Sequence, residues 1–186
     1  MTELAAEYPG RNLLPREVGS LRLSEVVPAN ISLIMPFEGA ESAVSEILTK
    51  ACGMGFPKPN RTSSKKNARL VWNGLSCALL LGPPPDKALR KHAAVVDKTD
   101  GWLVMNLTGS GLTGVLARLT PLDLRPAHFR RGHASVSLLG HVPAVFSKIG
   151  AETFQIMVPR SMARTATEDL WRAMKSCTAQ ALREQD

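Results

Sequence analysis

The stretch ISLIMPFEGAESAVSEILTKACG, residues 31–53, decides the fold class because its hydrophobic period changes partway along. The first seven residues alternate and are rich in β-branched side chains, which predicts a strand. In residues 41–51, Val44, Ile47 and Leu48 follow the i, i+3, i+4 spacing of an amphipathic helix. Gly53 stands just beyond them, where a helix C-cap is expected. A strand followed by such a helix predicts a fold that mixes the two.

The chain after Gly53 continues this alternation. Residues 55–67 have the composition of a loop. Strands are predicted at 68–73 and 76–82, forming a hairpin, and a further strand at 93–100. Between them, prolines at 83–85 suit the entry of a short helix over 83–92. The order β-α-β-β-α-β is the ferredoxin-like split arrangement.

A second round begins at Trp102 with a strand, followed by a helix whose apolar stripe runs from Leu112 to Leu119. Strands at 134–139, 142–147 and 153–158 are predicted to form a meander. The last helix is expected from about Ser161 or Thr165 to residue 182, with Thr165-x-x-Glu168 as a capping-box candidate.

We therefore expect an α+β fold of two successive ferredoxin-like-type units, residues 30–100 and 101–186, sharing one sheet system. Residues 1–29 carry prolines and glycines without a clean period, and they are expected to form an extended N-terminal arm, either frayed or laid across a partner.

Composition limits the class of protein. No apolar run approaches the roughly 18 residues of a membrane span, so no membrane partner is expected. The first twenty residues carry charges and no apolar core of a signal peptide, which predicts a cytoplasmic location. Three cysteines far apart in sequence suit reduced thiols.

The formal charge of +7 allows two interpretations, a nucleic-acid binder or a subunit that docks on an acidic partner. There is no aromatic RNA-binding strand and no zinc knuckle, so nucleic acid is not the predicted partner. The basic residues are interpreted as solvated faces, and the densest clusters are Arg61/Lys65/Lys66/Arg69, Lys87/Arg90/Lys91 and Arg125/Arg130/Arg131.

Catalytic, cofactor-binding and metal-ligating residues are not predicted. The histidines and cysteines show neither C-x-x-C nor H-E-x-x-H spacing. The run GSGLTG at 109–114 is a formal G-x-G-x-x-G, but no parallel strand with an acidic residue follows it. We interpret it as a glycine-rich turn from strand to helix, with Ser110 as N-cap.

Two motifs carry a resemblance to a known family. PLDLRPAHF at Pro121–Phe129 and V-x-R-S at Val158–Ser161 lie within about 70 similar residues, and together they resemble the sarcosine oxidase gamma subunit family. Residues 79–89, LLLGPPPDKAL, are similar to a further stretch of that family but lack its tryptophan.

The resemblance implies a fold related to the folate-binding domain of the glycine-cleavage T-protein. It implies a complex that demethylates sarcosine oxidatively to glycine, with tetrahydrofolate as one-carbon acceptor and hydrogen peroxide as product. FAD, FMN and NAD are expected on the larger subunits and zinc on the smallest. The gamma chain is then a non-catalytic subunit without a cofactor, in a complex with alpha, beta and delta subunits and most directly against alpha.

The motif residues are candidates for partner contact or for stabilising the fold. Asp123 can bond backbone N–H groups of its own loop, Phe129 can anchor the loop, and Ser161 can cap a helix. The alternatives are a stand-alone folate-binding module, for which the chain is about half the expected length, and a basic RNA-binding module. The candidate positions are Pro121, Asp123, Arg125, Pro126, Phe129, Arg160 and Ser161.

Overall fold

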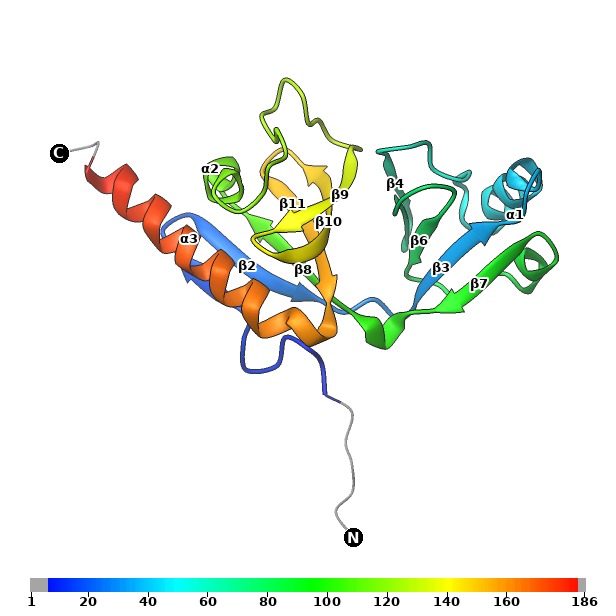
Figure 1. The fold of residues 1–186 in the computed structure, drawn as a ribbon, viewed down its shortest axis with the longest axis horizontal. Helices are drawn as coiled ribbons and strands as arrows, with labels where there is room; N and C mark the ends of the chain where they lie inside the picture. Colours follow the sequence, from blue (N-terminus) through cyan, green and yellow to red (C-terminus); the bar gives the residue numbers. More distant parts are fainter. Residues whose placement is uncertain (1–6, 184–186) are drawn as a thin grey trace, which may run out of the picture.

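The computed structural model describes residues 7–183 and shows four layers. Two antiparallel sheets face each other, and helices cover their outer faces (Figure 1). The predicted α+β class is confirmed. Among the described residues, no helix is long and apolar enough to cross a membrane.

The five-stranded sheet belongs to the first unit and has the order β4-β5-β6-β3-β7. Helix α1 (Glu41–Cys52) packs Val44 and Leu48 on its outer face, and Gly53 caps the helix in the left-handed conformation, as predicted. The strands are β3 (Ile31–Pro36), β4 (Thr62–Lys65), β5 (Ala68–Trp72), β6 (Ala78–Leu81) and β7 (Ala93–Asp97).

Two elements of this unit differ from the prediction. Strand β4 lies inside the predicted loop, because it is an edge strand in which only Thr62 is buried and no apolar alternation marks it. The second predicted helix is a 3₁₀ turn, η1 (Lys87–Lys91), which buries only Leu89. Asp86 is its N-cap, and the Asp86 carboxylate accepts a hydrogen bond from the N–H of Ala88 at 2.8 Å.

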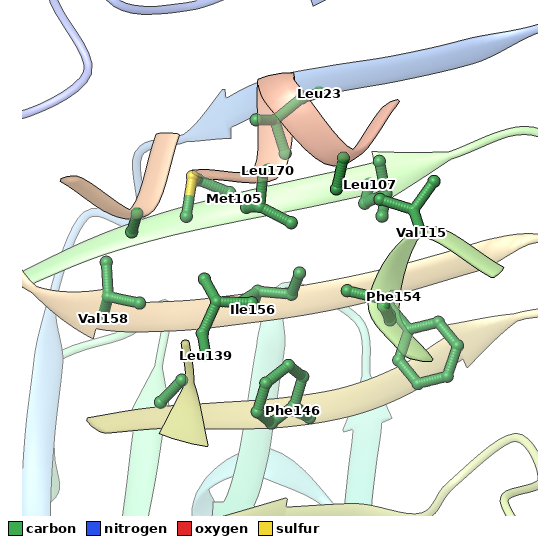
Figure 2. Packing of buried hydrophobic residues seen from close by; sticks show 14 of the residues in the cluster. Leu23, Met105, Leu107, Val115, Leu139, Phe146, Phe154, Ile156, Val158 and Leu170 are labelled. Carbon is green, nitrogen blue, oxygen red and sulfur yellow. The ribbon is translucent and has the colours of Figure 1, made fainter. Parts of the chain in front are cut away.

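The six-stranded sheet has the order β1-β2-β8-β11-β10-β9. Its last three strands pair in succession, so the predicted meander is confirmed. Helices α2 (Leu112–Ala117) and α3 (Ala163–Arg183) cover the outer face, and Figure 2 shows the packing between helices and strands. The strands are β1 (Arg16–Val18), β2 (Leu21–Val26), β8 (Trp102–Thr108), β9 (Ala134–Leu139), β10 (Val142–Gly150) and β11 (Thr153–Pro159).

The prediction of an extended arm is wrong for residues 16–26. They form β1 and β2, and β2 pairs with the central strand β8 while burying Leu21 and Leu23 in the core of the second unit. Two buried leucines between turn residues are too few to show a period. Residues 1–6 of the predicted arm lie outside the described part of the chain.

The two units do not share one sheet system as predicted. Each unit has its own sheet. The inner faces of the two sheets pack on each other, and helices cover the outer faces, so the strands of one sheet do not pair with those of the other. Between the sheets, Arg61 and His133 form an isolated antiparallel β-bridge, which does not extend into a shared ladder. The inner apolar cluster joins Ile31, Val71, Leu79 and Leu81 of one sheet to Val104, Ala134, Val145 and Met157 of the other.

Two predicted helix caps are also wrong. The N-cap of α2 is Gly111, while the hydroxyl of Ser110 lies 2.8 Å from that of Ser20. Thr165 lies inside α3, which begins at Ala163 directly after the 3₁₀ turn η3 (Arg160–Met162). A further 3₁₀ turn, η2 (Thr99–Gly101), links the two units.

Candidate functional site

The first sequence motif forms an exposed loop between α2 and β9. The Asp123 carboxylate accepts from the backbone N–H of Arg125 at 3.1 Å, as the sequence predicts, and from its guanidinium at 2.8 and 2.6 Å. These hydrogen bonds hold the pKa of Asp123 far below its usual value. His128 lies 3.9 Å from the same carboxylate. Pro121 and Pro126 are exposed, so this part of the loop faces solvent.

Phe129, at the end of the motif, points the other way. Its side chain is 8% exposed and stacks on Phe154, with ring centroids 5.7 Å apart. The ring of His133 meets it edge-on at 5.6 Å. Phe129 is therefore an anchor that fixes the loop to the core of the six-stranded sheet, and its ring is covered by the chain itself.

The residues after Phe129 clasp the two sheets together. The N–H of Gly132 donates to the carbonyl of Lys148 in β10, and the carbonyl of Gly132 accepts from the N–H of Thr62 in β4, both at 2.9 Å. The N–H of Ala134 donates to the carbonyl of Asn60 at 3.0 Å. The anchored loop thus sets the position at which the two units meet.

The second motif lies at the other end of β11. Arg160 donates to the carbonyl of Glu7 and lies 3.9 Å from the Asp100 carboxylate, so it ties the N-terminal segment to η2. A cavity of about 280 Å³ next to it is lined by Tyr8 and Trp102 among others. Ser161 is exposed in the middle of η3, so the prediction that it caps a helix is wrong. The structure does not bring the two motifs together.

A groove of about 700 Å³ lies between the sheets. Arg69 on β5 lines it from one side, and Asn106 on β8 and Gln155 on β11 line it from the other. A smaller pocket of about 200 Å³ adjoins it, shares Arg69 and adds Arg131. Arg69 and Arg131 belong to two basic clusters that the sequence analysis interpreted as separate solvated faces. In the structure they line adjoining pockets, and Arg69 is half-buried.

Gln155 is the unusual residue of this groove. It is 5% exposed, and its Nε2 donates to Oδ1 of Asn106 at 3.4 Å, while its Oε1 has no hydrogen-bond partner in the described part of the chain. Its neighbours Phe154 and Ile156 face the outer core, so strand alternation turns Gln155 toward the space between the sheets. In the sequence, this glutamine stands out as a polar residue inside the apolar run FQIMV, a pattern that indicates a buried polar site and that the sequence analysis missed.

Metal and thiol chemistry find little support in the geometry. Within residues 7–183, no three His, Cys, Asp or Glu side chains gather as a metal site would require. The three cysteines are free thiols, and burial raises the pKa of Cys52 and of Cys77, which opposes thiolate formation.

The glycine-rich turn has a structural explanation. A Cβ on Gly109 would lie 1.9 Å from the carbonyl oxygen of Ser20, so the close approach of the β1–β2 turn requires a glycine there. The first glycine of the G-x-G-x-x-G run is therefore accounted for without a bound phosphate.

Comparison with solved structures shows a strong likeness to a sarcosine oxidase chain. A chain of the heterotetrameric sarcosine oxidase from Corynebacterium sp. U-96, in complex with pyrrole 2-carboxylate, superposes with a TM-score of 0.78 and 19% identity, over 93% of this chain and 96% of that one. At this identity the likeness shows the fold.

Two aspartate kinase structures give much weaker likenesses. The enzyme of Clostridium acetobutylicum has a TM-score of 0.37 and 9% identity, over 83% of this chain and 34% of that one. The regulatory subunit from Thermus thermophilus has a TM-score of 0.38 and 12% identity, over 85% and 99%. No curated protein matches the sequence.

The model of the sarcosine oxidase, gamma subunit family matches residues 86–179. This span runs from Asp86 into α3 and contains both motifs, the anchored loop and Arg160. It covers just over half of the chain, and the chain therefore belongs to the sarcosine oxidase gamma subunit family.

Proposed function

We propose that this chain is a non-catalytic gamma subunit that takes its place in a heterotetrameric sarcosine oxidase, an oxidoreductase of the cytoplasm. The observation that carries the proposal is the family match over residues 86–179. The fold likeness supports it, since it extends over nearly the whole of both chains. The role of the chain is then to assemble with subunits that carry the chemistry.

In this proposal the complex demethylates sarcosine oxidatively to glycine and passes the one-carbon unit to tetrahydrofolate, with hydrogen peroxide as the second product. The flavins FAD and FMN, together with NAD, belong to the larger subunits and zinc to the smallest. The gamma chain contacts the alpha subunit most directly and belongs to one assembly with beta and delta.

The charge of the chain suits such docking. A formal charge of +7 favours association with an acidic protein surface, because complementary charge raises the rate and specificity of assembly. Several motif residues are exposed and available for contact, whereas Phe129 is covered. The exposed ones are Pro121, Asp123, Arg125, Pro126, Arg160 and Ser161.

The proposal is tested by co-expressing the tagged chain with its native cell proteins and identifying what co-purifies. We expect the captured material to contain flavoprotein subunits with sarcosine-dependent peroxide formation. The chain purified alone is expected to carry no flavin or zinc and to show no turnover.

Three results would contradict this proposal. Turnover by the isolated chain would show a catalytic site of its own, and tight binding of tetrahydrofolate to the isolated chain would favour a folate-binding module. A salt-dependent shift on mixed nucleic acid would instead favour the RNA-binding alternative.

A further inference from the structure

One wall of the groove between the sheets contains a buried side-chain oxygen that lacks a hydrogen-bond donor. Gln155 is almost fully buried, and its Oε1 accepts no hydrogen bond within residues 7–183. A buried amide oxygen without a donor is destabilising, because it has given up its hydrogen bonds to water and gained none in return. Because its Nε2 bonds to Asn106, the amide is held in place with its acceptor free.

The lining of the groove and of its adjoining pocket carries uncompensated positive charge. Arg69 is half-buried, and burial followed by the repulsion of Arg131 lowers its pKa. No carboxylate of the described residues lies within salt-bridge distance of Arg69, Arg131 or the nearby Lys66. Like charges gathered in a cleft between two sheets favour a bound anion.

We propose that this groove receives an extended acidic segment of a partner subunit, with a peptide N–H donating to Gln155 and carboxylates facing Arg69 and Arg131. The inference rests on the proposed function, since it names how the partner is held. A peptide fits because it supplies a donor and an anion from one short segment, and because the groove is open and about 700 Å³ in volume.

The lining disfavours a nucleic-acid strand. No aromatic side chain lines either the groove or the adjoining pocket, so bases would find no surface on which to stack. Phosphate oxygens also offer no N–H donor to the free oxygen of Gln155. The groove therefore suits a protein segment better.

The test compares two charge-neutralising variants in the assembled complex. R69Q/R131Q removes one charge from the groove and one from its adjoining pocket, whereas K87Q/R90Q removes two from the exposed turn η1 and leaves both unchanged. We expect R69Q/R131Q to weaken binding to the co-purified flavoprotein by about tenfold or more, with a shallower salt dependence, and K87Q/R90Q to change it little.

A second variant separates binding from folding. Q155M replaces the amide by an apolar side chain of similar length and removes the unsatisfied acceptor. Asn106 loses its 3.4 Å hydrogen bond from Gln155 but is partly exposed and can bond to water, so the free chain should unfold at a higher temperature. The same variant should bind the partner more weakly. A structural role alone would move stability and binding in the same direction.

The outcomes distinguish the two proposals. If the wild-type chain captures no flavoprotein, the proposed function fails and this inference fails with it. If the wild type captures it, but R69Q/R131Q and Q155M bind as well as K87Q/R90Q, the gamma subunit role stands and the groove is not the docking site. Equal weakening by both double variants would also overturn the assignment, because net charge would then explain it.

Discussion

At the scale of single residues, the motif PLDLRPAHF divides into an outer and an inner part. Asp123 and Arg125 form an exposed, bidentate pair that stiffens the loop, and Phe129 inserts into the core and stacks on Phe154. The motif therefore stabilises the fold through Phe129 and keeps the Asp123–Arg125 pair on the exposed side of the loop.

Replacing Phe129 by alanine should lower the free energy of unfolding by about 3 kcal/mol, because it leaves a cavity beside Phe154. Urea denaturation measures this change. F37A is the matched control, since Phe37 is 50% exposed and its truncation should have a small effect. Similar losses in the two variants would show that Phe129 is not an anchor.

The Asp123 carboxylate should give the loop a pH-dependent stability. Its pKa is depressed in the folded chain, so its contribution is present above the ordinary value of 3.8 and is lost as the pH falls below it. D123N should therefore melt slightly below the wild type at neutral pH, with the difference closing in acid. E38Q serves as the control for net charge, because it changes an exposed carboxylate that makes no ion pair within residues 7–183. A difference that persists at low pH would contradict this prediction.

At the scale of elements, the turn between β1 and β2 is held by its contact with the segment leading into α2. Gly109 has φ +113° and lies against the backbone of Ser20, while the hydroxyls of Ser20 and Ser110 are within hydrogen-bond distance. This contact brings the first strand pair, which no sequence period marks, onto the edge of β8.

Substitution of Gly109 by alanine should lower the free energy of unfolding by about 2 kcal/mol or more, since both the positive φ and the approach of Ser20 oppose a Cβ. Guanidinium denaturation measures it. At Gly114 in α2 a Cβ meets nothing, so G114A should stabilise the chain by up to about 1 kcal/mol through helix propensity. Equal effects at the two positions would refute the contact.

At the scale of the whole molecule, the two units are joined by an apolar cluster and by the clasp around Gly132. Leu79 of the five-stranded sheet and Met157 of the six-stranded sheet belong to this shared cluster. Neither sheet can expose its inner face without exposing that of the other, so the chain should unfold as one cooperative body.

Truncating Leu79 to alanine should therefore destabilise both units together, by about 3 kcal/mol. Hydrogen exchange checks this, because the slowest amides of β5 and of β11 should lose the same protection free energy. V96A changes a side chain that is 38% exposed on the edge strand β7, and it should leave both unaffected. Loss of protection in β5 alone would mean that the units unfold independently.

The elements with strong periods were predictable from sequence. The strand at 31–36, helix α1 with its cap at Gly53, and the meander of the second unit all follow from apolar spacing that burial enforces. Strands β2 and β4 were missed, since one buries two leucines and the other a single threonine. Short strands that bury few residues are stabilised by their neighbours in the sheet, which a local pattern does not contain.

For the site, the sequence by itself determined the local chemistry of the motif loop, where Asp123 bonds a residue two positions away. The tertiary structure alone decided the groove. Arg69, Arg131 and Gln155 come from separate elements, and the pairing of strands together with the packing of two sheets brings them around one cleft. Local hydrogen bonds and apolar periods involve residues close together in the sequence, so the sequence predicts them. Contacts between side chains far apart in the sequence depend on how the inner faces of the two sheets pack.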